Sequence, residues 1–166
     1  MLFLLVGCTP EPTVADSEAF YESQPEYLRP IPVSNIPDGI ENIDAKTCGG
    51  CHQEIYQEWL LSSHSKAWMG DPQFQAELHK KREDGGTVSW MCVNCHTPNI
   101  QQLSQLVVGL DGGLQRPILI DNPLFDKQFQ KDGVSCAGCH VRDGVILGPW
   151  GDSDCLLYTS PSPRDS

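Results

Sequence analysis

Three short segments of this chain place two cysteines and a histidine in the same order and spacing. They are Cys48-x-x-Cys51-His52, Cys92-x-x-Cys95-His96 and Cys136-x-x-Cys139-His140. In a helical turn, the two-residue spacer brings both thiols to positions from which they can add to the two vinyl groups of a porphyrin. The adjoining histidine then lies under the iron. The spacing predicts three haem c sites with His52, His96 and His140 as proximal ligands.

Two other kinds of site use paired cysteines. A zinc site uses Cys-x-x-Cys pairs but does not require a histidine directly after each pair. A disulfide framework suits an exported protein, yet it also gives no reason for the histidine. Only five of the 166 residues are histidines, so chance does not explain one after every pair.

Two further histidines, His64 and His79, are candidates for distal haem ligands. Apolar residues at helical spacing predict one helix from Gln53 to Trp68. At about 1.5 Å and 100° per residue, His64 would lie roughly 18 Å along this helix from His52. We therefore expect His64 to serve a different haem from His52, whereas His79 stands before a run of cations that favours a solvated surface.

Methionine is a further possible ligand, since a thioether sulfur can bind haem iron. Met69 and Met91 are available, although packing is the favoured interpretation of both. Three irons then have one good histidine candidate and one weaker one. At least one iron is expected to be open, bound by methionine, or capped by a residue outside this sequence.

The elements that must position these residues are short. We expect a helix from Pro72 that buries Phe74 and Leu78, and a short amphipathic helix over 103–110. Residues 116–121 are expected to be a strand or an extended segment, and 125–131 a short helix before the third motif. The predicted fold is mainly α with extensive loops, in which haem faces form much of the core.

Composition limits the class of partner. The formal net charge is −11 and the sequence pI is about 4.6, which excludes nucleic acid as a partner because no basic patch is available for phosphates. The acidic surface instead favours a basic docking partner. No apolar run approaches the ~20 residues that a membrane-spanning helix needs.

The two ends differ from the middle of the chain. Residues 1–8 resemble the end of a bacterial lipoprotein signal peptide, which makes Cys8 the expected lipid anchor. Residues 9–43 are rich in proline and acidic residues and are expected to be a tether without a sustained helix. The haem domain is expected over 44–154. Residues 155–166 resemble a translated sequencing adapter, so we expect the natural protein to continue beyond Asp154.

The segment "CGGCHQEIYQEWLLSSH", together with "CVNCHTP" and "DGVSCAGCHVRDGVILGP", resembles the multihaem cytochrome c family that includes tetrahaem carriers accepting electrons from hydroxylamine oxidation. The resemblance covers about residues 44–150. It matches Trp59, Ser62 and His64 to the family's Trp-x-x-Ser-x-His pattern, and it implies that His64 is the distal ligand of another haem in a stacked array. A fourth haem motif is absent from this sequence.

We therefore expect a lipid-anchored, extracytoplasmic multihaem cytochrome, in the periplasm or at the cell surface. It would pass electrons between redox proteins or a quinol-linked complex. One alternative is an oxidoreductase whose open haem acts on a small nitrogen or sulfur compound. Another is a subunit of a haem-bearing filament or assembly.

Overall fold

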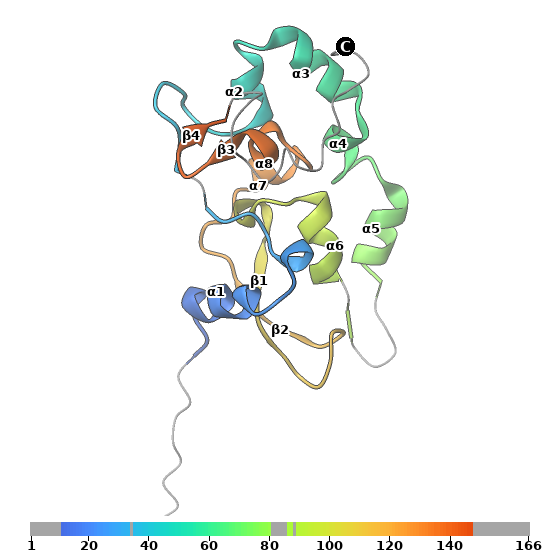
Figure 1. Ribbon diagram of the computed structural model, residues 1–166. Helices are drawn as coiled ribbons and strands as arrows, with labels where there is room; N and C mark the ends of the chain where they lie inside the picture. The colour runs from blue at the N-terminus through green and yellow to red at the C-terminus, as the bar shows by residue number, and fades with distance from the viewer. Residues whose placement is uncertain (1–10, 34, 81–85, 88, 148–166) are drawn as a thin grey trace, which may run out of the picture.

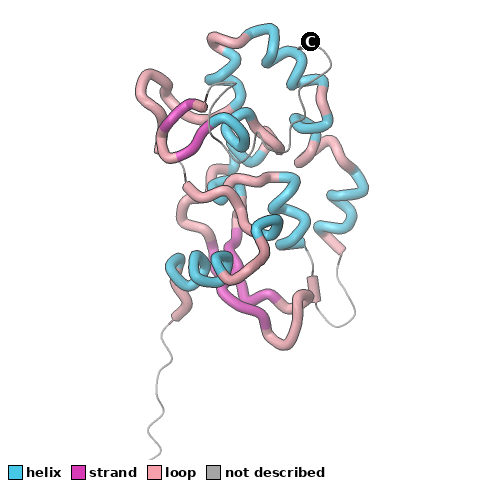
Figure 2. The backbone as a smooth tube through the Cα atoms, in the orientation of Figure 1, coloured by secondary structure: helices cyan, strands magenta, loops and turns pink. Residues whose placement is uncertain are grey.

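The structure is a computed structural model that describes residues 11–33, 35–80, 86–87 and 89–147. Short helices dominate it, joined by long loops, with two small hairpins (Figures 1 and 2). The α-helices are α1 (Val14–Glu22), α2 (Ala45–Gly49), α3 (Gln53–Leu61), α4 (Ser63–Lys66), α5 (Pro72–Leu78), α6 (Ser89–His96), α7 (Lys127–Gln130) and α8 (Cys136–His140). Two 3₁₀ turns cover Glu26–Leu28 and Ile100–Gln102. The mainly α fold class expected from the sequence is confirmed.

One region of the molecule is built on an antiparallel hairpin of β1 (Gln105–Leu110) and β2 (Pro117–Asp121), which lies low in Figure 1 with α1 and α6. Leu106 pairs with Ile120, and Val107 with Leu119; a bulge follows before Gly109. Tyr21 of α1, Trp90 of α6 and Val107 form a buried cluster. The hairpin thus supplies the floor on which α6 is fixed.

The helix predicted over 103–110 is wrong, because residues 105–110 form strand β1. The apolar spacing fitted a helix, but the segment also holds two adjacent β-branched residues and Gly109, which favour a strand over a helix. A pairing partner at 117–121 then satisfies the backbone of β1. The strand expected in that second segment is confirmed as β2.

The expectation that residues 9–43 lack a helix is also wrong, since α1 lies in this segment. Asp16 accepts hydrogen bonds from the Thr13 amide at 2.7 Å and the Thr13 hydroxyl at 2.8 Å, which caps the helix start and lowers the pKa of Asp16. Tyr21 is buried against β1, and burial raises the pKa of its hydroxyl. Part of the predicted tether is therefore packed into the fold.

The other region contains α2, α7, α8 and a second hairpin of β3 (Val141–Arg142) and β4 (Val145–Ile146), with α3 arching above them in Figure 1. Its apolar core is small, comprising Ile43, Phe129, Ala137 and Val141. The short helix predicted before the third motif is confirmed as α7. Asp126 caps α7 by accepting from the Gln128 and Phe129 amides.

The single helix predicted from Gln53 to Trp68 is wrong, because the chain is extended at Ser62 (ψ 163°) and divides into α3 and α4. The serine hydroxyls explain the break by competing for main-chain carbonyls. Ser62 donates to the Trp59 carbonyl at 2.7 Å, and Ser65 to the Leu60 carbonyl at 3.0 Å. The distance estimated for His64 along one continuous helix therefore does not hold.

Buried amide side chains join the two regions. Gln102 donates to the carbonyls of Phe129 and Gly133, both at 2.9 Å, and Gln130 donates to the Gln102 carbonyl at 2.8 Å. Asn122 donates to the carbonyls of Ile100 and Leu103. Since such bonds are costly to break when buried, the segment after the second motif is held firmly to the segment before the third. No helix among the described residues meets the length and hydropathy required to cross a membrane.

Candidate functional site

The first motif occupies the end of α2 and the turn that follows. Asp44 caps this helix by accepting from the Thr47 amide at 2.6 Å. The Cys48 carbonyl then accepts from the amides of Cys51 at 3.3 Å and His52 at 3.0 Å. The two cysteines and the histidine are thus on one helical turn, as haem attachment requires.

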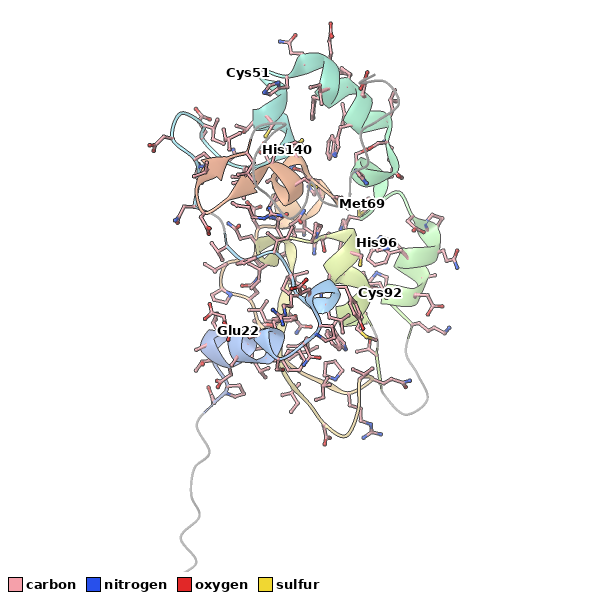
Figure 3. The ribbon with its side chains drawn as sticks, in the orientation of Figure 1. Glu22, Cys51, Met69, Cys92, His96 and His140 are labelled. Atoms are coloured by element: carbon pink, nitrogen blue, oxygen red, sulfur yellow. The ribbon has the colours of Figure 1, made fainter. Side chains whose placement is uncertain are left out.

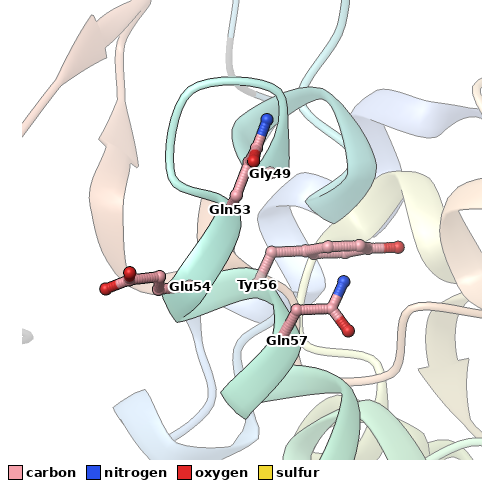
Figure 4. A pocket seen from close by; sticks show the side chains of 5 residues that line it. All are labelled: Gly49, Gln53, Glu54, Tyr56 and Gln57. Atoms are coloured by element: carbon pink, nitrogen blue, oxygen red, sulfur yellow. The ribbon is translucent and has the colours of Figure 1, made fainter.

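A hollow of about 320 Å³ opens beside this turn, lined by Gly49 and by α3 residues that include Gln53 and Tyr56 (Figure 4). The Tyr56 ring packs on Gly49 and stacks on Trp59, with ring centroids 5.7 Å apart. No residue of α3 is buried, and Leu61 is 86% exposed. The helix therefore presents an aromatic and apolar surface that the described protein does not cover.

The second motif is the most firmly positioned. Its histidine, His96, lies at the end of α6, where Nδ1 is 2.6 Å from the Ala67 carbonyl. A carbonyl only accepts, so Nδ1 carries the proton and Nε2 is left to bind metal. The Phe74 ring stacks flat on the imidazole with centroids 3.8 Å apart, and Trp68 packs edge-on against Phe74. The predicted burial of Phe74 is confirmed, and Leu78 is half-buried.

The third motif is α8 itself. Arg142 donates to the carbonyls of Val141 at 2.7 Å and Gly138 at 2.8 Å, so its guanidinium caps the end of this helix. His140 is exposed (Figure 3). The predicted proximal ligand thus lies on the surface beside a fixed cation.

The first and third motifs meet through their leading cysteines. The thiols of Cys48 and Cys136 are hydrogen-bonded to each other; this bond lowers the pKa of Cys48 to about 7 and raises the pKa of Cys136. The Asp132 carboxylate reinforces the junction by accepting from the Ala45 amide at 2.8 Å. In Figure 3, Cys51 and His140 lie together in the upper part of the view, whereas Cys92 and His96 lie lower, on α6. The structure therefore brings the first and third motifs together as a pair and keeps the second motif apart from them.

His64 lies between these two groups. Its carbonyl accepts from the Val134 amide at 3.1 Å, two residues before the third motif. A Cβ on Gly133, whose φ is +62°, would lie 2.6 Å from the same carbonyl, so glycine is required for this approach. The Trp59 indole also donates to the Val134 carbonyl at 2.9 Å. The segment that carries His64 is thus docked against the entrance to α8.

The other distal candidate, His79, caps the end of α5 with its backbone, and its side chain is exposed. It borders a cavity of about 350 Å³ that is also lined by Trp68, Trp90 and Val93. No cysteine or histidine of the second motif lines this cavity. His79 thus lies near the second motif, sharing this cavity with its spacer residue Val93, but not against the cysteines or the histidine of that motif.

The two methionines differ. Met91 packs against the cluster of Tyr21, Trp90 and Val107, which confirms packing as its role. The prediction of packing for Met69 is wrong, because its side chain is 67% exposed. It lies two residues after Ala67, whose carbonyl is 2.6 Å from Nδ1 of His96, and Figure 3 shows it above His96 in the view. Met69 thus belongs to the segment that bonds to Nδ1 of His96 and not to the nitrogen left for iron.

The residues present fit haem c. Cys48, Cys51, Cys92 and Cys95 are free thiols, and each of the three motifs has the helical turn that thioether attachment needs. Large apolar side chains such as Ile55, Leu61 and Met69 are exposed on the segment between the first and second motifs, as expected for surfaces that a porphyrin covers. Among the described residues, no group of three or more His, Cys, Asp or Glu side chains could hold a metal ion. Cys8 and Cys155 lie outside the described residues.

Sequence reasoning missed the groups that position the motifs. Phe74 was expected only as core, whereas it stacks on His96; the Ala67 carbonyl and Asp132 were not considered. A stacked aromatic and a main-chain carbonyl leave no local signal in sequence. Asp132, four residues before Cys136, could have been noticed as an acidic residue close to a haem motif.

Comparison with known proteins gives one family match. Residues 47–112 match the family model described as cytochrome c554 and c-prime. The match includes the first two motifs, His64 and His79, and it ends before the third motif. No curated protein and no solved structure matches the chain. The match supports a multihaem c-type cytochrome with haem c as its cofactor; the number of haem sites stays a prediction.

Proposed function

We propose that the protein carries electrons outside the cytoplasm as a membrane-tethered multihaem cytochrome c with three haems in this sequence. The contact between Cys48 and Cys136 is the observation that carries the proposal. It would place two porphyrin edges beside each other. When bound, haem c supplies the one-electron chemistry of its iron.

The chain's own residues would hold the haems as follows. The thioether bonds form at the three Cys-x-x-Cys pairs: Cys48 and Cys51, Cys92 and Cys95, Cys136 and Cys139. His52, His96 and His140 bind iron from the proximal side. His96 does so through Nε2, with the Ala67 carbonyl fixing its ring.

We assign His64 to the iron of the third motif. Its main chain bonds to Val134, just before that motif. The Ala67 amide donates to the His64 carbonyl at 3.2 Å, and the Ala67 carbonyl is 2.6 Å from Nδ1 of His96, so the segment that carries His64 approaches His96 at the nitrogen that is not left for iron.

The His64 assignment is tested by electron paramagnetic resonance of the oxidised, haem-loaded full-length protein. His64→Ala should convert one haem from low spin to high spin without releasing it, because thioether attachment does not depend on the distal ligand. His79→Ala is the matched control and should leave the signals of the third haem unchanged. An unaltered spectrum in His64→Ala would refute the assignment.

The proposed partners are a basic redox protein or a quinol-linked complex, and the electron donor is a system that oxidises hydroxylamine or a related nitrogen compound. The net charge of −11 supports a basic partner through electrostatic steering. Stopped-flow reduction by a basic donor should slow as salt is raised. Rates that do not depend on salt would contradict a charge-steered encounter.

The tether is proposed from Cys8, which would carry the lipid on the periplasmic or outer face of a bacterial membrane. Cys8→Ser should move the protein from the membrane fraction to the soluble extract while its haem content stays the same. Retention in the membrane fraction would refute the lipid anchor.

The ligand count favours one alternative function. Three irons share only two histidines beyond the proximal ones in this sequence, and no cysteine or histidine of a motif lines the cavity beside the exposed His79 side chain. The haem of the second motif would then be open to a small nitrogen or sulfur compound. Carbon monoxide binding to the reduced protein, lost in a Cys92→Ser/Cys95→Ser variant, would identify that haem as the open one.

A further inference from the structure

A half-buried carboxylate, Asp132, lies at the junction of the first and third motifs. One of its oxygens accepts from the Ala45 amide in the first turn of α2. It lies four residues before Cys136, and its bond to Ala45 ties it to the helix that carries Cys48. Asp132 therefore occupies a place from which a single charge reaches two haem sites.

The surroundings of Asp132 are anionic. In addition to burial, the negative charges of Asp44, which caps α2, and Asp126, which caps α7, raise the pKa of its carboxyl group. Lys131 is adjacent in sequence, but its ammonium donates to Gln128. Within the described ranges the one ion pair joins Lys80 and Glu77, so no cation is paired with this carboxylate.

We propose that the Asp132 carboxyl group is a proton-binding site shared by the haems of the first and third motifs, so that it gains a proton when either haem gains an electron. The inference rests on the proposed haem attachment. When a redox protein delivers the first electron to this pair of haems, Asp132 takes up one proton from solvent and the carboxylate becomes a neutral acid; the second electron then arrives without further proton uptake at Asp132. The added negative charge at the haem pair is thereby compensated.

The electrostatics of the site favour this coupling. Burial, together with Asp44 and Asp126, raises the pKa of Asp132, while the bond from Ala45 lowers it. The pair Cys48 and Cys136 becomes uncharged as thioethers, and Asp44 and Asp126 remain as side chains whose charge raises the pKa of Asp132. Each electron added nearby makes the neutral acid more favourable still.

The test is spectroelectrochemical titration of the haem-loaded full-length protein between about pH 5 and pH 9. The midpoint potential of at least one haem should fall as pH rises, by at most about 59 mV per pH unit, the value for one proton per electron. In Asp132→Asn the dependence should be lost. At high pH this variant should also have the higher potential, because an anion has been removed.

Three comparisons separate a loss of the proton site from a loss of structure. In Asp132→Asn the new side chain can still accept from the Ala45 amide, so that hydrogen bond is kept. Asp132→Glu keeps the carboxyl group and should keep the dependence of the potential on pH. Glu54→Gln removes an exposed carboxylate close to the first motif and should leave the slope unchanged. Infrared difference spectra should show a protonated carboxyl band on reduction that Asp132→Asn lacks.

The outcomes separate the two proposals. A protein without bound haem would refute the proposed function. Bound haems whose potentials do not vary with pH, or a slope that persists in Asp132→Asn, would overturn the role of Asp132 alone. A slope lost equally in Asp132→Glu would also overturn it, because the effect would then be structural.

Discussion

The second motif and the pair formed by the first and third motifs are positioned in different ways. The second lies on an eight-residue helix whose Trp90 is buried against the hairpin, and its histidine is fixed by Ala67 and Phe74. The paired motifs lie on helices of five residues, and His52 and His140 are exposed. The protein thus fixes the histidine of the second motif through its own packing, whereas the histidines of the first and third motifs are not held in this way.

The largest expected effect separates the pair from the single site. Cys136→Ser/Cys139→Ser should lose the third haem and also shift the potential of the first, because the two sites touch at Cys48 and Cys136. Cys92→Ser/Cys95→Ser should also lose one haem, but it should shift the potential of the first haem less than Cys136→Ser/Cys139→Ser does. Intact-protein mass gives the haem count, and potentiometry gives the shift. Equal shifts of the first haem in both variants would contradict the pairing.

A second prediction concerns the core under the second motif. Trp90 is 4% exposed and donates its indole N–H to the Leu114 carbonyl at 2.9 Å. Trp90→Ala should lower the free energy of unfolding by about 3–5 kcal/mol, as for other large-to-small core changes. The measurement is chemical denaturation followed by circular dichroism.

The control for Trp90 is an exposed apolar residue of the other region. Leu61→Ala removes a side chain that is 86% exposed, and without haem cover it should cost less than about 0.5 kcal/mol. A cost for Leu61→Ala similar to that of Trp90→Ala would mean that a haem covers α3 as fully as the hairpin covers α6.

Features that depend on neighbouring residues could be predicted from the sequence, whereas features that depend on residues far apart in the chain could not. Each motif helix was predictable, since five adjacent residues determine it. The strand β1 was not, because the spacing of Leu103, Leu106 and Leu110 also suits a helix, and its pairing with β2 decides between them. The contact between Cys48 and Cys136 joins positions far apart in the chain and depends on tertiary packing.

Prediction of the candidate site from the sequence was limited in the same way. His64 was predictable as a ligand of a haem other than that of His52, but the assignment to the third motif needs the bond to Val134. The break at Ser62 was missed because serine hydroxyls bond locally to carbonyls that helical periodicity treats as already paired.

A third, smaller effect distinguishes the two spacer residues within the first motif. A Cβ on Gly49 would lie 2.5 Å from Cγ of Tyr56, so Gly49→Ala must displace the ring and should cost about 1–3 kcal/mol. Gly50→Ala is the matched control, because its Cβ would meet only the Thr47 carbonyl at 3.2 Å. Thermal unfolding of both variants tests this; equal stability would show that Tyr56 moves freely once haem is bound.

The smallest expected effect compares the caps of the paired helices. Asp44 accepts a hydrogen bond at the start of α2, so Asp44→Ala should destabilise the protein by about 1 kcal/mol. Ser135 stands at the same position before α8, but its hydroxyl is buried without a partner. Removing an unpaired buried hydroxyl relieves its desolvation cost, so Ser135→Ala should be neutral or slightly stabilising. If haem-loaded Ser135→Ala instead loses as much stability as Asp44→Ala, the hydroxyl has a partner in the loaded protein, and α8 is capped only once its haem is attached.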